Sequence, residues 1–264
     1  MSRPRSFNTE ALVVRSTELG EADRLLTLLT PAYGKLQVSA RGVRKATSKL
    51  GGHLDLLTRS SLTLSQGQSL DTITGAEAVE TFMALKADLR ALSKALYLLE
   101  LADAFHPLGS PNPPAYDLLL ETLRVLESTA DHELALRFCE LRLLDLCGFL
   151  PQLAQCVQCQ EKLLPGGHFL SPAAGGVLCP ACKAPFADAA PISVEALKVL
   201  RYLATNLLAA AMRVNVGPPL QRELAALLSN LLRYTLEREL RSAAFLRTIA
   251  QQWPKAEGLA ASAP

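Results

Sequence analysis

The chain has 264 residues and a formal net charge of +2, and 49% of its residues are hydrophobic. This length is enough to bury a sizeable core, and two or three domains are expected. No run approaches the roughly 20 apolar residues of a membrane helix, and the first residues lack the apolar segment of a secretory signal. These features exclude membrane-spanning and secreted classes, so we expect a soluble, cytoplasmic protein.

Charge is distributed unevenly along the chain. Residues 1–60 contain 10 basic and five acidic side chains, a net charge of +5, whereas the remainder contains 17 basic and 20 acidic side chains, a net charge of −3. A basic N-terminal module on a mildly acidic remainder indicates that anions are bound at the front of the chain. The alternative is a basic face that is merely solvated.

Five short strands are predicted in the N-terminal region, which we assign to residues 1–81. Alternating or continuous apolar runs bounded by turn residues mark them. They are predicted at residues 11–15, 24–29, 35–41, 54–64 and 70–74. Five strands in about eighty residues favour a small barrel of the oligonucleotide-binding (OB) type.

The third predicted strand and the loop after it are basic. Lys35 and Arg41 alternate with apolar residues and should face outward, and the glycine-bounded loop 42–52 adds three cations without an acid. Such a surface can track a phosphate backbone, and the scarcity of aromatic residues favours sequence-tolerant, salt-sensitive binding. The alternative is a small barrel with a solvated loop. The predicted DNA-binding residues are Arg15, Arg24, Lys35, Arg41, Arg44, Lys45 and Lys49.

From Phe82 onward, leucines recur at helical spacing, which predicts a mainly α-helical domain in two parts, residues 82–150 and 191–250. Helices are expected from Phe82 to about His106, from about 111 through 126, from about 131 to 148, from a Ser193 cap, and from Gly217 towards Phe245. The tail, residues 251–264, is predicted to be disordered. On the first helix, Lys86, Arg90 and Lys94 are expected to form the basic rim of a groove for a protein partner.

Residues 151–190 between the two helical parts contain the strongest chemical signal. Two Cys-x-x-Cys pairs, Cys156/Cys159 and Cys179/Cys182, supply four soft ligands for a closed tetrahedral zinc site. Two short strands, at 166–171 and 175–178, are expected between the pairs, as in a zinc ribbon. With four thiolates the shell is full, so the one zinc ion is predicted to be structural. Two disulfides or four ordinary buried thiols are the alternatives.

Sequence motifs of common hydrolytic enzymes are missing from the chain. It contains no Gly-x-x-x-x-Gly-Lys-Ser/Thr phosphate loop, no Gly-x-Ser-x-Gly elbow and no His-Glu-x-x-His pair, and its four histidines are scattered. We therefore expect a binding protein with no catalytic residues. A repair enzyme whose site is dispersed along the chain, or a zinc-ribbon interaction subunit that does not touch DNA, are the alternatives.

Taken together, these segments resemble the RecO family of bacterial DNA repair proteins, in its zinc-bearing branch. The order of the parts matches over nearly the whole chain. The residues that carry the resemblance are 11–15, 20–26, 34–35, 40–45 and 76–77 in the barrel, and Cys156, Cys159, Phe169, Gly175, Gly176, Cys179 and Cys182 in the ribbon.

The resemblance implies a recombination mediator of the RecF pathway. Such a protein binds single- and double-stranded DNA and anneals complementary strands. With RecR and the single-stranded DNA-binding protein, it helps to load RecA onto DNA. The resemblance implies no catalysis, and it makes the acidic, apolar tail of the single-stranded DNA-binding protein a candidate partner for the helical domain.

Overall fold

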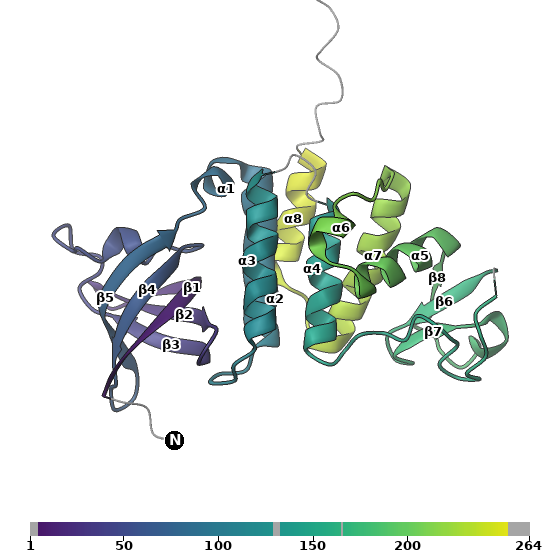
Figure 1. Ribbon diagram of the computed structural model, residues 1–264, viewed down its shortest axis with the longest axis horizontal. Coiled ribbons are helices and arrows are strands. Elements are labelled where there is room, and N and C mark those ends of the chain that lie inside the picture. Colours follow the sequence, from purple (N-terminus) through teal and green to yellow (C-terminus); the bar gives the residue numbers. More distant parts are fainter. Residues whose placement is uncertain (1–4, 129–132, 165, 253–264) are drawn as a thin grey trace, which may run out of the picture.

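The computed structural model describes residues 5–128, 133–164 and 166–252. The molecule is elongated, with a barrel at one end, a small sheet at the other and helices between them (Figure 1). None of the helices in the described part of the chain combines the length and the hydropathy needed to cross a bilayer. The predicted fold, an OB-type barrel followed by a helical domain with a four-cysteine ribbon inserted in it, is confirmed.

Five strands form the closed barrel, in the order β1-β2-β3-β5-β4. Most of the strand pairs are antiparallel. The barrel is closed by a short parallel pairing of β3 with β5, in which Val38 lies opposite Asp71 and Ser39 opposite Thr72. The fourth strand begins later than predicted, because residues 54–58 form an irregular segment before it. The strands are β1 Ser6–Leu19, β2 Asp23–Thr30, β3 Gly34–Ala40, β4 Arg59–Ser65 and β5 Asp71–Glu80, and the short helix η1 is Gly51–His53.

Strand β1 uses both of its faces. Ala11 and Val13 point into the barrel core, whereas Leu12 and Val14 join the larger core of the helical domain. The register with β2 shifts between Val13 and Arg15, so Val14 is the additional residue of a β-bulge. A bulge turns the strand locally and re-aims side chains, and here it leaves both Val14 and Arg15 directed at the helices. The barrel and the helices are therefore packed against each other.

Strand β3 approaches the helical domain even more closely. Gly34 has φ +67°, and a Cβ atom at this position would lie 2.1 Å from the carbonyl oxygen of Ser110, in the loop after α2. Glycine is required here by both the conformation and the space. The backbone N–H of Gly109 donates to the carbonyl of Lys35 at 2.9 Å, which fixes this loop on the barrel.

Within the described residues, eight α-helices form the body between the barrel and the small sheet. Two predicted helices are each broken in two: Asp88 separates α1 from α2, and its carboxylate accepts hydrogen bonds from the backbone N–H groups of Arg90 and Ala91. Glu237, with φ +52°, ends α7 before α8. The helices are α1 Met83–Ala87, α2 Leu89–Phe105, α3 Pro113–Ser128, α4 Glu133–Leu146, α5 Val194–Thr205, α6 Leu208–Ala211, α7 Pro218–Leu236 and α8 Arg241–Gln252.

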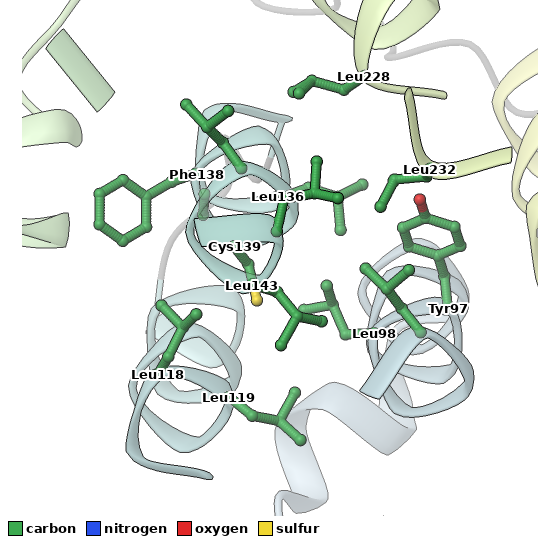
Figure 2. Close-up of a cluster of buried hydrophobic side chains, with 14 of the residues drawn as sticks. Tyr97, Leu98, Leu118, Leu119, Leu136, Phe138, Cys139, Leu143, Leu228 and Leu232 are labelled. Atoms are coloured by element: carbon green, nitrogen blue, oxygen red, sulfur yellow. The ribbon is translucent and has the colours of Figure 1, made fainter. Parts of the chain in front are cut away.

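Leucine stripes from these helices meet in one core, as the periodicity predicted. Figure 2 shows side chains of α2, α3, α4 and α7 converging around α4. The predicted cap of α5 is present, since the Ser193 hydroxyl accepts from the N–H of Ala196 at 3.0 Å. Helix α8 reaches Gln252, so residues 251 and 252 of the predicted disordered tail are helical, and the rest of that predicted tail lies outside the described residues. The labelled core residues are Tyr97, Leu98, Leu118, Leu119, Leu136, Phe138, Cys139, Leu143, Leu228 and Leu232.

The ribbon sheet has three strands in the order β7-β6-β8. Strands β6, His168–Ser171, and β7, Gly176–Leu178, are the two predicted strands, and β8, Ala190–Ile192, is an addition that leads into α5. A short helix η2, Pro180–Cys182, begins directly after Cys179 and ends at Cys182, the two members of the second cysteine pair. His168 lies in β6, and its Nε2 atom contacts the backbone carbonyl of Leu164.

Candidate nucleic-acid interface and metal centre

The basic loop that follows β3 is fixed on the barrel by its backbone and by one apolar side chain. Val43 is buried in the barrel core, and the N–H groups on either side of it are held: Gly42 donates to the Asp23 carboxylate at 2.7 Å, and Arg44 donates to the carbonyl of Ala22 at 2.9 Å. With Val43 pointing inward, its neighbours must project outward. The sequence thus builds an ordered loop with its cations on the surface.

Arg41, Arg44, Lys45 and Lys49 are all exposed at this end of the barrel. Arg44 forms an ion pair with Glu18 at 3.0 Å. This pair was not predicted, because the loop itself contains no acidic residue and Glu18 lies in β1. In the described part of the chain, no ion pair involves Arg41, Lys45 or Lys49. Pairs between exposed groups contribute little to stability, so Arg44 can exchange Glu18 for a phosphate at small cost. We name residues 41–49 the basic loop.

Arg24 lies beside the basic loop, because β2 pairs it with Ala40 at the end of β3. Its guanidinium forms a 3.4 Å ion pair with the exposed Asp55. The structure therefore brings together five of the seven predicted DNA-binding residues: Arg24, Arg41, Arg44, Lys45 and Lys49.

Lys35 and Arg15 lie elsewhere, and the expectation that Lys35 and Arg41 share one open strand face is wrong. Strand β3 ends at Ala40, before Arg41, and Lys35 sits at its other end against α2. The Lys35 ammonium donates to the backbone carbonyl of Asp103 at 2.7 Å and pairs with its carboxylate at 3.1 Å, and Arg15 pairs with the same carboxylate at 3.0 Å. The helical domain covers this face of the barrel, so two of the predicted cations bridge the domains.

The expectation that Lys86, Arg90 and Lys94 form one groove rim also fails. Lys86 lies in α1 and donates to the Thr58 hydroxyl of the barrel at 3.0 Å, and burial lowers its pKa. Lys94 lies in α2, is only 9% exposed and pairs with Glu133 at 2.7 Å. Because the helix breaks at Asp88, the register expected from a continuous helix does not hold across this segment.

The four predicted metal ligands meet at one point. The Sγ atoms of Cys156, Cys159, Cys179 and Cys182 all lie within 4.8 Å of one another, and those of Cys159 and Cys179 are 3.9 Å apart. A tetrahedral zinc ion with Zn–S bonds near 2.3 Å requires sulfur separations of roughly 3.8 Å. These sulfurs are too far apart for disulfides, and all six cysteines are free. The cluster can hold one metal ion in a closed shell.

Electrostatics within the cluster favour a cation. Burial opposes ionisation of Cys156, but the N–H groups of Cys159, Cys179 and Gln158 point at its sulfur and bring its pKa to about 6. The neighbouring Cys179 raises the pKa of Cys182 to about 12. One thiolate thus forms readily while a second is discouraged, so four thiolates can coexist only around a metal ion.

A close backbone approach shapes the ribbon around the cluster. Gly176 pairs with Gln152, and a Cβ atom at Gly176 would lie 2.5 Å from the carbonyl oxygen of Gln152. The Val157 N–H donates to the Val177 carbonyl at 3.0 Å, which ties the first cysteine pair to β7. The Arg201 guanidinium of α5 donates to the Leu153 carbonyl at 2.7 Å, so the ribbon is also attached to the helices.

Sequence patterns did not identify the acids that join the barrel to the helices. Asp103 binds Arg15 and Lys35, while Glu80 at the end of β5 binds Arg124 of α3 through two bonds of 2.7 and 2.8 Å and Arg59 at 3.3 Å. The Arg124 hydrogen bond, with help from Arg59, holds the pKa of Glu80 below its usual range. The sequence did show an excess of acidic residues after residue 60, but this excess did not identify Asp103 or Glu80 as the acids at the junction.

A closed OB-type barrel with an exposed basic loop, packed on a helical body with a four-thiol ribbon, defines a multidomain barrel protein of the oligonucleotide-binding class. The family "Recombination protein O N terminal" matches residues 1–82, and "Recombination protein O C terminal" matches residues 86–244. The chain therefore belongs to the recombination protein O (RecO) family, and its role is in DNA repair and recombination.

Curated relatives agree over nearly the whole chain. The DNA repair protein RecO of Dehalococcoides mccartyi is 38% identical over 251 residues, which is 95% of this chain and 99% of the relative. The DNA repair protein RecO of Roseiflexus sp. is 40% identical over 249 residues, 94% of this chain and 88% of the relative. That of Desulforudis audaxviator is 40% identical over 243 residues, 92% and 97% respectively.

Proposed function

We propose that this protein acts in recombinational repair by binding DNA at the basic loop of its barrel. The observation that carries the proposal is the exposure of Arg41, Arg44, Lys45 and Lys49 on one ordered loop, with Arg24 beside it. Exposed cations on a small barrel suit the phosphate backbone of single strands and, through the same charge, of duplexes. Binding at phosphates is tolerant of sequence and weakens with salt.

The same proposal extends to the RecF pathway. A protein that binds two complementary strands through their backbones can anneal them, and as a mediator it would work with RecR and the single-stranded DNA-binding protein to load RecA. The RecO family assignment supports these partners. The helical domain as a whole, rather than the rim expected at Lys86 and Lys94, is the candidate contact for the partner's acidic tail. Because a mediator of recombinational repair would act on the chromosome, we propose that the protein is cytoplasmic and associated with the nucleoid.

For the metal centre, we propose one structural zinc ion held by Cys156, Cys159, Cys179 and Cys182. A four-thiolate shell suits zinc and leaves no position for water or substrate. The ion would order the ribbon between the two helical parts, and no chemistry on DNA is assigned to it.

A salt titration of DNA binding tests the proposal. The variant Arg44→Ala/Lys45→Ala/Lys49→Ala should reduce the slope of log affinity against log salt by roughly 2 on oligo-dT, because each lost phosphate contact changes the slope by about 0.7. A mixed-sequence strand should respond equally. The matched control removes three exposed cations of the helical domain, Lys198→Ala/Arg213→Ala/Arg222→Ala, and should leave the slope unchanged.

Two results would overturn the proposal. An unchanged slope in the basic-loop variant would remove the loop from the DNA site, and a loss confined to one sequence would mean that bases are read instead. Incubating the protein with labelled DNA and ATP distinguishes a binding protein from an enzyme. We expect the DNA and the ATP to remain intact. Cleavage of either would favour a repair enzyme.

A further inference from the structure

A groove of about 720 Å³ lies between the barrel and the helices, away from the basic loop. Strands β1 and β3 form one wall, α2 forms the floor, and the start of α8, which packs along α2 (Figure 1), forms the other wall. A volume of this size is typical of sites for single ligands and fits a short stretch of one strand rather than a duplex. Its lining includes Val14, Arg15, Lys35, Leu96, Leu99, Glu100, Asp103, Arg238, Arg241 and Phe245.

The charges that line the groove favour an anion. Four cations stand against two carboxylates, and both carboxylates are engaged by the protein. Asp103 is bound by Arg15 and Lys35, while Glu100 accepts from the backbone N–H groups of Arg241 at 3.1 Å and Ser242 at 2.7 Å and from the Ser242 hydroxyl. The groove therefore has an excess of positive charge at its outer wall, where Arg238 and Arg241 are exposed.

Phe245 gives this wall an aromatic face. It follows Arg241 by four residues on α8, so the two side chains lie on the same face of the helix. The residue is 41% exposed, and it lines a groove whose floor includes Leu96 and Leu99. An exposed ring in a groove lined by guanidinium groups is a combination with which proteins stack a base while holding the adjacent phosphates.

We propose that this groove binds a stretch of single-stranded nucleic acid, with phosphates on Arg238 and Arg241 and a base stacked on Phe245. The inference rests on the proposed function and extends the strand's path from the barrel onto the helical domain. Arg15 of the groove and Glu18, the partner of Arg44 in the basic loop, lie three residues apart on β1. Because residues three apart point to opposite faces of a strand, a nucleic-acid strand would cross the edge of β1 in passing from the basic loop to the groove.

Two variants test the groove separately from the basic loop. Arg238→Gln/Arg241→Gln should reduce the salt slope on oligo-dT by roughly 1.4, at about 0.7 per phosphate contact. Phe245→Leu should weaken binding roughly 5- to 100-fold without changing the slope, because it removes the ring that stacks on a base but no charge. Phe245→Tyr keeps a ring and should bind with the affinity of the wild type. Arg213→Gln/Arg222→Gln, with the same loss of charge at exposed positions of the helical domain, is the matched control. Thermal unfolding shows whether each variant is folded.

Other outcomes distinguish the groove from the proposed function. If the basic-loop variant lowers the slope and the groove variants bind like the wild type, the groove inference is overturned and the proposed function stands. If neither set of variants alters the slope, both are overturned. An acidic, apolar peptide could use the same cations and leucines, so a labelled peptide of this kind is tested too. Loss of peptide binding in the groove variants with unchanged DNA binding would assign the groove to a protein partner and overturn the inference.

Discussion

Asp103 is the residue at which the barrel is tied to α2. Its carboxylate, only 12% exposed, pairs with Lys35 and Arg15, and its carbonyl accepts from the Lys35 ammonium. In Asp103→Asn, Lys35 keeps the carbonyl but loses its counter-charge while only 14% exposed. We expect a loss of about 1–3 kcal/mol in the free energy of unfolding, measured with urea, because a largely buried cation is left without its partner.

The control for Asp103 is Glu121→Gln, a change of the same charge at an exposed position of α3. Surface changes of this kind usually alter stability by less than about 0.5 kcal/mol. Equal urea midpoints for the two variants would show that the Asp103 pairs do not hold the domains together.

Glu80 gives the barrel junction a dependence on pH. Arg124 and Arg59 hold its folded pKa below the ordinary value of 4.5, so its stabilisation is present in full above that value and is lost as the pH falls through the folded pKa. The urea midpoint of the wild type should exceed that of Glu80→Gln at pH 7, and the difference should narrow between about pH 5 and pH 3. A difference that stays constant over this range would show that the charge of Glu80 is not its source.

At the residue scale, the sequence predicted the site residues that are marked by local spacing, and it did not predict the ion pairs between residues that are distant in the chain. Two Cys-x-x-Cys pairs predict a metal site because the ligands of each pair are adjacent in the chain. Arg44 and Lys45 were found because they follow a strand. Asp103 lies 68 residues from Lys35, and no local pattern reveals that the two meet. For the same reason, the sequence pattern predicted that Lys35 lies on an open face of the barrel, whereas the helices cover that face.

At the scale of elements, we expect the ribbon to depend on the proposed zinc ion for its local folding. Binding and local folding are coupled in such modules, so Cys159→Ser should lower the zinc content from about one equivalent and reduce the melting temperature together. Cys147→Ser changes a free cysteine outside the cluster and should retain the metal. Full zinc retention in Cys159→Ser would exclude the four-thiolate site.

The helices show where periodicity is sufficient and where it fails. Leucine spacing predicted the bodies of α3, α4 and α5, because a stripe of apolar residues must face the core. It did not predict the breaks at Asp88 and Glu237, since the apolar pattern continues through both. Asp88 caps α2 with its carboxylate, a signal that is present in the sequence but weaker than the leucine stripe around it.

For the whole molecule, the main consequence is that the barrel is packed firmly on the helical body. Leu12 and Val14 of β1 share one core with the helices, and Gly34 admits the loop after α2 at backbone distance. Domain boundaries can be predicted from changes in periodicity, but the packing of one domain on another cannot, because it depends on pairs of distant residues. The packing leaves the basic loop exposed on the barrel. The path that we propose for a DNA strand runs from this loop to the groove beside α8.

Hydrogen exchange with and without oligo-dT tests the placement of DNA most directly. The N–H groups of Arg44 and Lys45 are bonded within the loop region, to Ala22 and Gly42, so their exchange reports on whether the loop is covered or stabilised. We predict that oligo-dT slows exchange in residues 41–50, and that this protection disappears at high salt and in the Arg44→Ala/Lys45→Ala/Lys49→Ala variant. Protection confined to the ribbon, residues 151–190, with an unaffected basic loop would contradict the account.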